Sequence, residues 1–167
     1  TIERTAADVI ITFDEDGLYW HPDHIAVHER TIATIAACQA GGPALYYVSL
    51  PPGAMRAVVD HAVAVSATRE SIAASPTRVL GVADADAFGA GAPPPSLVLD
   101  TGRFARQKLL ALQCHRSQIR DNDALSLVTL ADSPRLLGVE HYRRAEVGSA
   151  GETFLDRLAP APEHRAR

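Results

Sequence analysis

The sequence predicts an α/β fold in which helices cover both faces of a mostly parallel sheet. Short β-branched or aromatic runs recur along the chain, segments with helical spacing of apolar residues separate them, and 47% of the 167 residues are hydrophobic. Such a composition is ordinary for a globular protein with a real core. Strands that alternate with helices are typical of parallel sheets. We therefore expect one domain over residues 1–167.

The first predicted strand covers residues 8–13 (DVIITF), a β-branched run that ends in the turn-like sequence of residues 14–17. A helix is predicted over residues 21–40, because Pro22 suits a first helical turn and two glycines follow the last residue. This order predicts a strand, a loop and a helix.

A second strand is predicted over residues 44–50 (ALYYVSL), which prolines and a glycine terminate, and a helix over residues 54–67. Residues 77–83 fit a short strand. Residues 83–95 are rich in Ala, Gly, Pro and Asp, which indicates a surface loop near a site.

A third strand is predicted over residues 96–101 (SLVLDT), followed by a helix over residues 103–118. Residues 121–137 suit a short helix, and residues 139–147 (VEHYRRAEV) fit a charged edge strand. Residues 152–167 are expected to form a polar tail with two prolines.

The charge and cysteine content exclude several classes of function. A formal net charge of -4 argues against a nucleic-acid or anionic-membrane partner, because such proteins concentrate Lys and Arg. No apolar run approaches the roughly 18 to 20 residues of a membrane span. Cys38 and Cys114 lie in apolar helical stretches and are interpreted as small buried residues. We expect a cytoplasmic protein.

Side chains capable of chemistry are concentrated in residues 14–24 (DEDGLYWHPDH), between the first strand and the next helix. Ligands of parallel sheets bind beyond the carboxyl ends of the strands. His21 and His24 are three positions apart, so both can face that crevice if a helix begins at Pro22. One imidazole could bind a metal while the other handles protons, and Asp23 could orient a histidine.

Two other interpretations of these residues stay open. The segment also fits a polar helix start, in which Asp23 favours the positive end of the helix dipole. His28 follows His24 by four residues, a spacing that suits a metal pair on a helix. A buried position behind the site, on the same helix face, is the other interpretation of His28.

Residues 16–28 (DGLYWHPDHIAVH) resemble the second signature of the PIG-L/LmbE-like de-N-acetylases, which usually have glycine in place of Trp20. A later segment with Lys108, His115 and Gln118 also resembles this family, although these residues could equally form an exposed helix face. The resemblance implies a Rossmann-like three-layer sandwich. It also implies zinc-dependent removal of the acetyl group from a small-molecule amide or amino-sugar conjugate, such as an N-acetylglucosamine-type compound.

The resemblance also implies roles for individual residues. His24 would be a zinc ligand, and His21 the catalytic histidine that stabilises the transition state or protonates the leaving amine. Tyr19 would contact the oxyanion, and Asp23 would support the histidines. His115 would shape the site or contact the substrate. Trp20, at the position of the family's glycine, would narrow the pocket, stack on a sugar or cover the helix start.

The family's first signature, Ala-His-Pro-Asp-Asp-Glu, has no match in residues 1–167. In the family it supplies the other zinc ligands and the aspartate that acts as general base, and a catalytic zinc needs three protein ligands. We therefore expect the chain to be the C-terminal part of a deacetylase domain, without its N-terminal strands and inactive alone.

The missing residues would come from an upstream segment, or from another chain or a second copy paired with the sheet edge at residues 8–13. A degenerate family member that binds a sugar or nucleotide without catalysis is the alternative.

Overall fold

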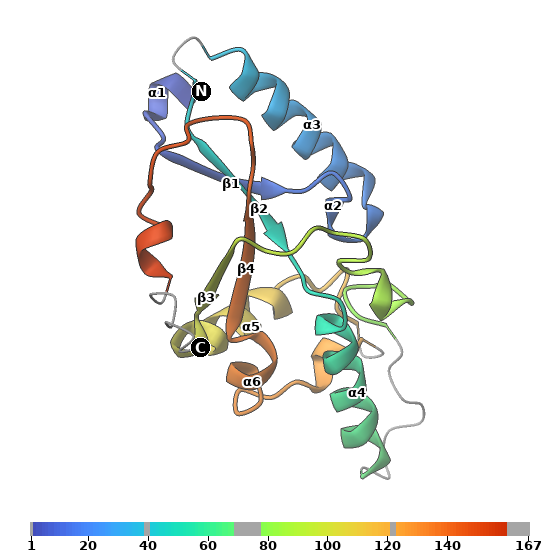
Figure 1. Ribbon diagram of the computed structural model, residues 1–167. Coiled ribbons are helices and arrows are strands. Elements are labelled where there is room, and N and C mark those ends of the chain that lie inside the picture. Colours follow the sequence, from blue (N-terminus) through green and yellow to red (C-terminus); the bar gives the residue numbers. More distant parts are fainter. Residues whose placement is uncertain (1, 39–40, 69–77, 121–122, 160–167) are drawn as a thin grey trace, which may run out of the picture. The chain divides into compact units, whose positions relative to one another are not determined.

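The computed structural model describes residues 2–38, 41–68, 78–120 and 123–159 (Figure 1). The chain divides into two compact units, each treated by itself below. The first comprises Thr1–Leu50, Gly91–Leu99 and Glu140–Arg167, and the second Pro51–Ala90 and Asp100–Val139. None of the helices in the described ranges combines the length and the hydrophobicity needed to cross a membrane.

A four-stranded sheet organises the first unit, in the order β1-β2-β4-β3. β1 runs parallel to β2, with Val9 opposite Ala44 and Phe13 opposite Val48. The α/β class and the first three predicted strands are confirmed. The strands are β1 (Val9–Phe13), β2 (Ala44–Ser49), β3 (Leu97–Asp100) and β4 (Val139–Arg144).

The predictions of a mostly parallel sheet and of an edge strand at residues 139–147 are wrong. β4 lies between β2 and β3 and runs antiparallel to β2. Its charges suggested an edge, but Arg143 and Arg144 each meet a carboxylate, of Asp14 and Asp156 respectively. Charged residues are tolerated inside a sheet when they are paired and hydrogen-bonded.

Alternate residues of β2 contribute to two hydrophobic clusters, one on each face of the sheet. The clusters are Leu45 and Tyr47 with Ile35 of α3, and Ala44 and Tyr46 with Leu97, Leu99 and Leu155. The first face is covered by α3 (Pro22–Ala36), which packs against β1. This helix confirms the one predicted from residue 21, of which residues 39–40 lie outside the described ranges. A short α1 (Ile2–Thr5) precedes β1.

The C-terminal segment packs against the second face rather than forming a polar tail. Thr153 and Leu155 are buried, and a 3₁₀ turn, η4 (Asp156–Leu158), follows them. Both prolines of the predicted tail lie in residues 160–167, outside the described ranges.

In the second unit, the predicted helix over residues 54–67 is confirmed. The predicted helix over residues 103–118 is divided into a 3₁₀ turn and a shorter α5, so Cys114 follows the helix end and is exposed rather than buried. Of the short strand predicted over residues 77–83, residue 77 lies outside the described ranges, and Arg78, Val79 and Val82 form only isolated bridges. The helices and turns are α4 (Ala54–Ala67), η1 (Ala85–Ala87), η2 (Gly102–Phe104), α5 (Ala105–Gln113), η3 (Ala124–Leu127) and α6 (Ser133–Leu137).

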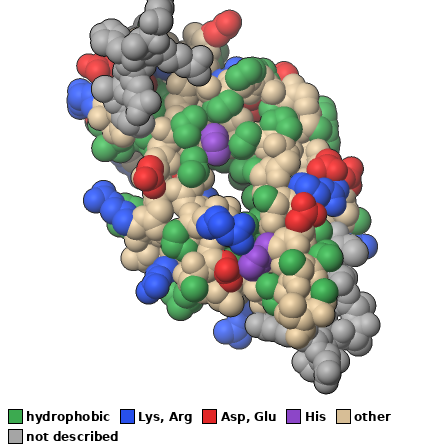
Figure 2. Space-filling view, turned by 60° about the horizontal axis from the view of Figure 1, so that its bottom comes forward, with side chains coloured by type: hydrophobic (Ala, Val, Ile, Leu, Met, Phe, Trp, Pro, Cys, Tyr) green, Lys and Arg blue, Asp and Glu red, His purple; other side chains and the backbone are tan. Residues whose placement is uncertain are grey.

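The core of the second unit forms where α4 contacts η1, η3 and α6, and where α5 packs on α6. Ala85 and Phe88 are buried, so the predicted loop over residues 83–95 is partly internal. Figure 2 shows hydrophobic side chains among acidic and basic ones on one face of the molecule.

Candidate active site

The loop after β1 is fixed at its first residue by an ion pair. Asp14 is only 4% exposed. Arg143 donates to both of its carboxylate oxygens, from Nε to Oδ2 at 2.9 Å and from Nη2 to Oδ1 at 2.6 Å. The backbone N–H of Glu15 also donates to Asp14 Oδ1, at 2.8 Å. Bidentate arginine–carboxylate ion pairs are strong and directional. This ion pair therefore joins the end of β1 to β4.

The next residues form one distorted turn, α2 (Gly17–Trp20). Asp16 caps this turn by accepting the Leu18 N–H at 2.9 Å. Leu18 and Trp20 have left-handed φ angles of 69° and 64°, which non-glycine residues adopt mostly at functional sites or in strained turns. Glycine is favoured at position 17, because its φ is +56° and an added Cβ would lie only 3.0 Å from His24 Cβ.

His24 has its tautomer set by this turn. Its Nδ1 lies 3.1 Å from the carbonyl oxygen of Gly17. A carbonyl only accepts, so Nδ1 carries the proton, and in the neutral ring Nε2 carries the lone pair. The ring stacks on Phe13, with centroids 3.7 Å apart and planes within 2°. Histidines that bind metals are typically held this way, through the other ring nitrogen, so His24 fits the predicted zinc ligand.

His21 has the opposite tautomer. It caps α3, and its Nδ1 accepts the backbone N–H of Asp23 at 3.2 Å. The lone pair is therefore on Nδ1, and the neutral ring carries its proton on Nε2. The ring centroids of His21 and His24 are 4.6 Å apart. Two adjacent imidazoles thus offer different groups, a lone pair from His24 and an N–H donor from His21.

Tyr19 lies edge-on to both histidines, with ring centroids 5.7 Å from His21 and 5.4 Å from His24. Burial raises the pKa of its hydroxyl, which keeps the group protonated and able to donate a hydrogen bond. Asp23 contacts His21 through its backbone amide, and its side chain is exposed in the first turn of α3.

His28 lies one turn further along α3. Its Nδ1 donates to the carbonyl oxygen of Phe13 at 3.0 Å, and its ring lies 5.2 Å from that of Tyr47. It is partly buried, which agrees with a position behind the site.

The structure does not assemble a complete metal site from the described part of the chain. Among those residues, no group of three or more His, Cys, Asp or Glu side chains gathers closely enough to hold an ion. The segment with Lys108, His115 and Gln118 belongs to the second unit, where His115 and Gln118 are exposed. Its contribution to the site stays a prediction.

No protein-family model matches the chain. Curated relatives named 1D-myo-inositol 2-acetamido-2-deoxy-alpha-D-glucopyranoside deacetylase do match it. The protein of Acidothermus cellulolyticus is 30% identical over 143 residues, which are 84% of this chain and 46% of that protein. The protein of Salinispora arenicola is 28% identical over 149 residues, 86% of this chain and 45% of its own.

The chain belongs to the PIG-L/LmbE-like de-N-acetylase family. It spans about half the length of these curated relatives. The similarity extends far beyond the short histidine segment on which the sequence resemblance mainly rested. Within the family, the β1–α3 loop is this chain's candidate contribution to the active site.

Proposed function

We propose that this chain carries part of the active site of a deacetylase that hydrolyses the N-acetyl group of an amino-sugar conjugate, of the N-acetylglucosamine type or a related amide. The proposal rests on two contacts, of His24 Nδ1 with the Gly17 carbonyl and of His21 Nδ1 with the Asp23 N–H, which assign opposite tautomers to the two neutral rings. The names of the relatives support the reaction and the class of substrate.

His24 would hold zinc through Nε2. The hydrogen bond from Nδ1–H to the Gly17 carbonyl keeps the proton on Nδ1 and leaves the Nε2 lone pair available. When bound, zinc supplies Lewis-acid polarisation of the acetyl carbonyl. The Nε2–H of His21 and the hydroxyl of Tyr19 would donate hydrogen bonds to the oxyanion or the leaving amine. Such placed donors typically contribute on the order of 10² to 10³ in rate. Asp23 would support this arrangement by holding His21 through its amide.

We propose that the remaining zinc ligands and the general base come from polypeptide outside residues 1–167, and that the isolated chain is inactive. β1 is the end strand of the described sheet, and Ile11 on it is 45% exposed. A strand added parallel to β1 would end at the same edge as the candidate site. Such an addition would complete a Rossmann-like sandwich.

A groove of about 530 Å³ borders the same strand and one face of α3. The surface that lines this groove is mostly apolar. Its walls suit an additional packed element rather than a polar ligand. An upstream segment or a second chain, including another copy of this one, would cover it. The groove is lined by Ile2, Ile10, Ala26, Val27, Arg30, Thr31 and Thr34.

The test is to purify the product of the native gene and measure its intact mass under denaturing conditions, its zinc content and acetate release from N-acetylglucosamine conjugates. The proposal expects a species above 17.8 kDa, or a second chain, together with zinc and hydrolysis. A single 17.8 kDa species with full activity would contradict the need for outside residues. A complete, zinc-free product that binds the sugar without cleaving it would support the degenerate alternative.

A further inference from the structure

The candidate site is connected to β4 by a short series of contacts. Arg143 lies opposite Tyr47 of β2, and its guanidinium carbon is 4.8 Å from the centroid of the Tyr47 ring. The same guanidinium forms the ion pair with Asp14, whose side chain is 6% exposed. Arg143 is thus held on an aromatic face while it binds the first residue of the loop.

Asp14 transmits this contact to His24. The backbone carbonyl of Asp14 accepts the Gly17 N–H at 2.9 Å, and the carbonyl of Gly17 accepts the His24 Nδ1–H at 3.1 Å. Only two hydrogen bonds therefore separate the residue held by Arg143 from the candidate zinc ligand. A shift of Asp14 would displace the carbonyl that fixes the His24 tautomer.

The charge of Arg143 is needed to keep Asp14 where it is. A buried carboxylate without a partner is strongly unfavourable, so an unpaired Asp14 would move toward water and take the loop with it. Lysine cannot fully replace this arginine, because it lacks the planar guanidinium that binds a carboxylate in a bidentate way.

We propose that Arg143 is a positioning residue of the candidate site. Its ion pair with Asp14 holds the β1–α3 loop in the conformation that keeps His24 protonated on Nδ1 and presents the Nε2 lone pair. The value of that lone pair as a ligand rests on the proposed function, but the tautomer itself does not.

The test uses the full-length protein with ¹⁵N-labelled histidine, free of zinc, and long-range ¹H–¹⁵N spectra that distinguish a protonated ring nitrogen from one with a lone pair. Wild-type His24 is expected to show a single Nδ1–H tautomer. In Arg143→Met, and more weakly in Arg143→Lys, both tautomers should be populated. Titration with Zn²⁺ should then show affinity lower by on the order of 10 to 100-fold, the usual effect of losing an outer contact.

The matched control is Arg144→Met, which removes the neighbouring arginine on the opposite face. It should leave the His24 tautomer and the zinc affinity unchanged. Zinc affinity within twofold of wild type and an unchanged tautomer in folded Arg143→Met would overturn the positioning role. If Arg143→Met fails to fold, Arg143→Lys decides. Wild type that binds no zinc would instead count against the proposed function.

Discussion

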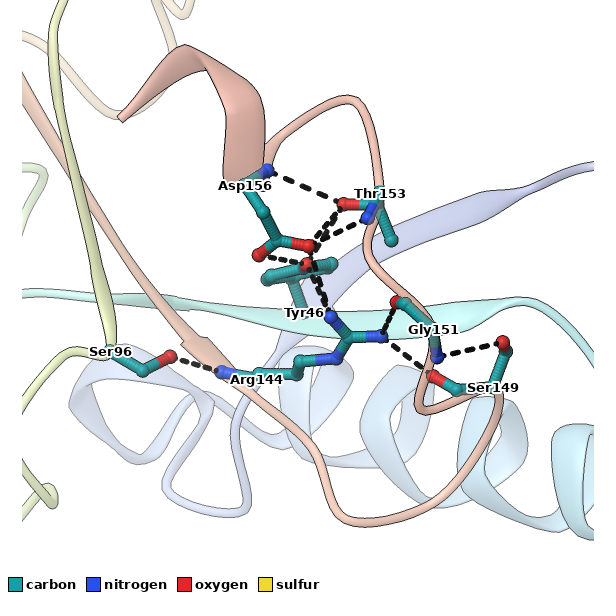
Figure 3. Close-up of polar contacts among 7 residues, drawn as sticks. All are labelled: Tyr46, Ser96, Arg144, Ser149, Gly151, Thr153 and Asp156. Carbon is teal, nitrogen blue, oxygen red and sulfur yellow. Dashed lines mark hydrogen bonds and ion pairs between the residues drawn. The ribbon is translucent and has the colours of Figure 1, made fainter. Parts of the chain in front are cut away.

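Arg143 and Arg144 are neighbours on β4, but their side chains lie on opposite faces of the sheet. On the face covered by α3, Arg143 binds Asp14 and so fixes the loop that carries both candidate histidines. On the other face, Arg144 binds Asp156 and the carbonyl oxygens of Ser149 and Gly151 (Figure 3).

The hydrogen bonds around Arg144 attach the C-terminal segment, residues 149–156, to β4. Asp156 accepts hydrogen bonds from the Tyr46 hydroxyl at 2.7 Å and from the Thr153 N–H at 2.8 Å, and Arg144 bridges this group to the preceding loop. Each residue drawn there contacts at least one other residue of the network. The same residue type in one strand can therefore serve a site on one face of the sheet and the packing of a segment on the other.

The largest effects are expected within the site itself. His24→Ala should release zinc, because the ring that presents the lone pair is gone. His21→Ala should retain zinc but lower turnover by on the order of 10² to 10³-fold, since it removes only a placed N–H donor. Zinc content by mass spectrometry and the rate of acetate release separate the two. Equal activity in His21→Ala would contradict the role assigned to it.

On the opposite face, Arg144→Met should destabilise the protein by about 1–3 kcal/mol, because Asp156 and two carbonyl groups lose a charged donor. Denaturant unfolding measures this change. Activity per bound zinc should stay at the wild-type level. A fall in activity per bound zinc, with the fold retained, would show that the two faces of the sheet are coupled.

Substitution of the exposed residue Trp20 is expected to change the affinity for the substrate by several-fold. Trp20 is 63% exposed and therefore accessible to a ligand, and narrowing the pocket, stacking on a sugar and covering the helix start all remain interpretations. Trp20 is the single tryptophan of residues 1–167, so the difference in fluorescence between the wild type and Trp20→Phe reports on its surroundings. Addition of an N-acetylglucosamine conjugate should alter the emission, and Trp20→Gly should raise KM more than it lowers kcat.

A control for this experiment combines Trp20→Phe with Phe154→Trp, which moves the reporter to an exposed position in the C-terminal segment of the same unit, on the opposite face of the sheet. Its emission should not respond to the sugar. An equal response from both positions would mean that the signal is nonspecific.

The smallest effect concerns pH. Burial alone would raise the pKa of Asp156, but hydrogen bonds from Tyr46 and Thr153 and the charge of Arg144 hold that pKa below its ordinary value. The stabilisation is therefore complete above the unfolded-state pKa of about 3.9 and is lost as the pH falls through the lower folded-state value. Thermal unfolding at pH 2 to 6 should show this loss, and Asp156→Asn should show a shallower dependence.

Part of the fold was predictable because it rests on local patterns. The β-branched run of β1, the proline at the start of α3 and the aromatic run of β2 each specify an element within a few residues. The helix over residues 103–118 was predicted too long, because apolar spacing continues past Gln113 while the backbone does not. Element boundaries depend on local hydrogen bonding that spacing does not reveal.

The site was predictable only in its composition. The dense histidine segment identified Tyr19, His21, Asp23 and His24, and acidic residues directly after a strand were the available signal for Asp14 and Asp16. Arg143 could not be found, since it follows Asp14 by 129 residues and nothing local connects them.

Local sequence patterns specify the elements around β1 and the chemical groups of the loop, because spacing and residue type act over short stretches of chain. The folded chain is needed to see that β4 is an interior antiparallel strand and that its two arginines lie on opposite faces of the sheet. It also assigned opposite tautomers to His21 and His24. These properties depend on which donor or acceptor each group meets, and the partners of β4 are distant in the chain.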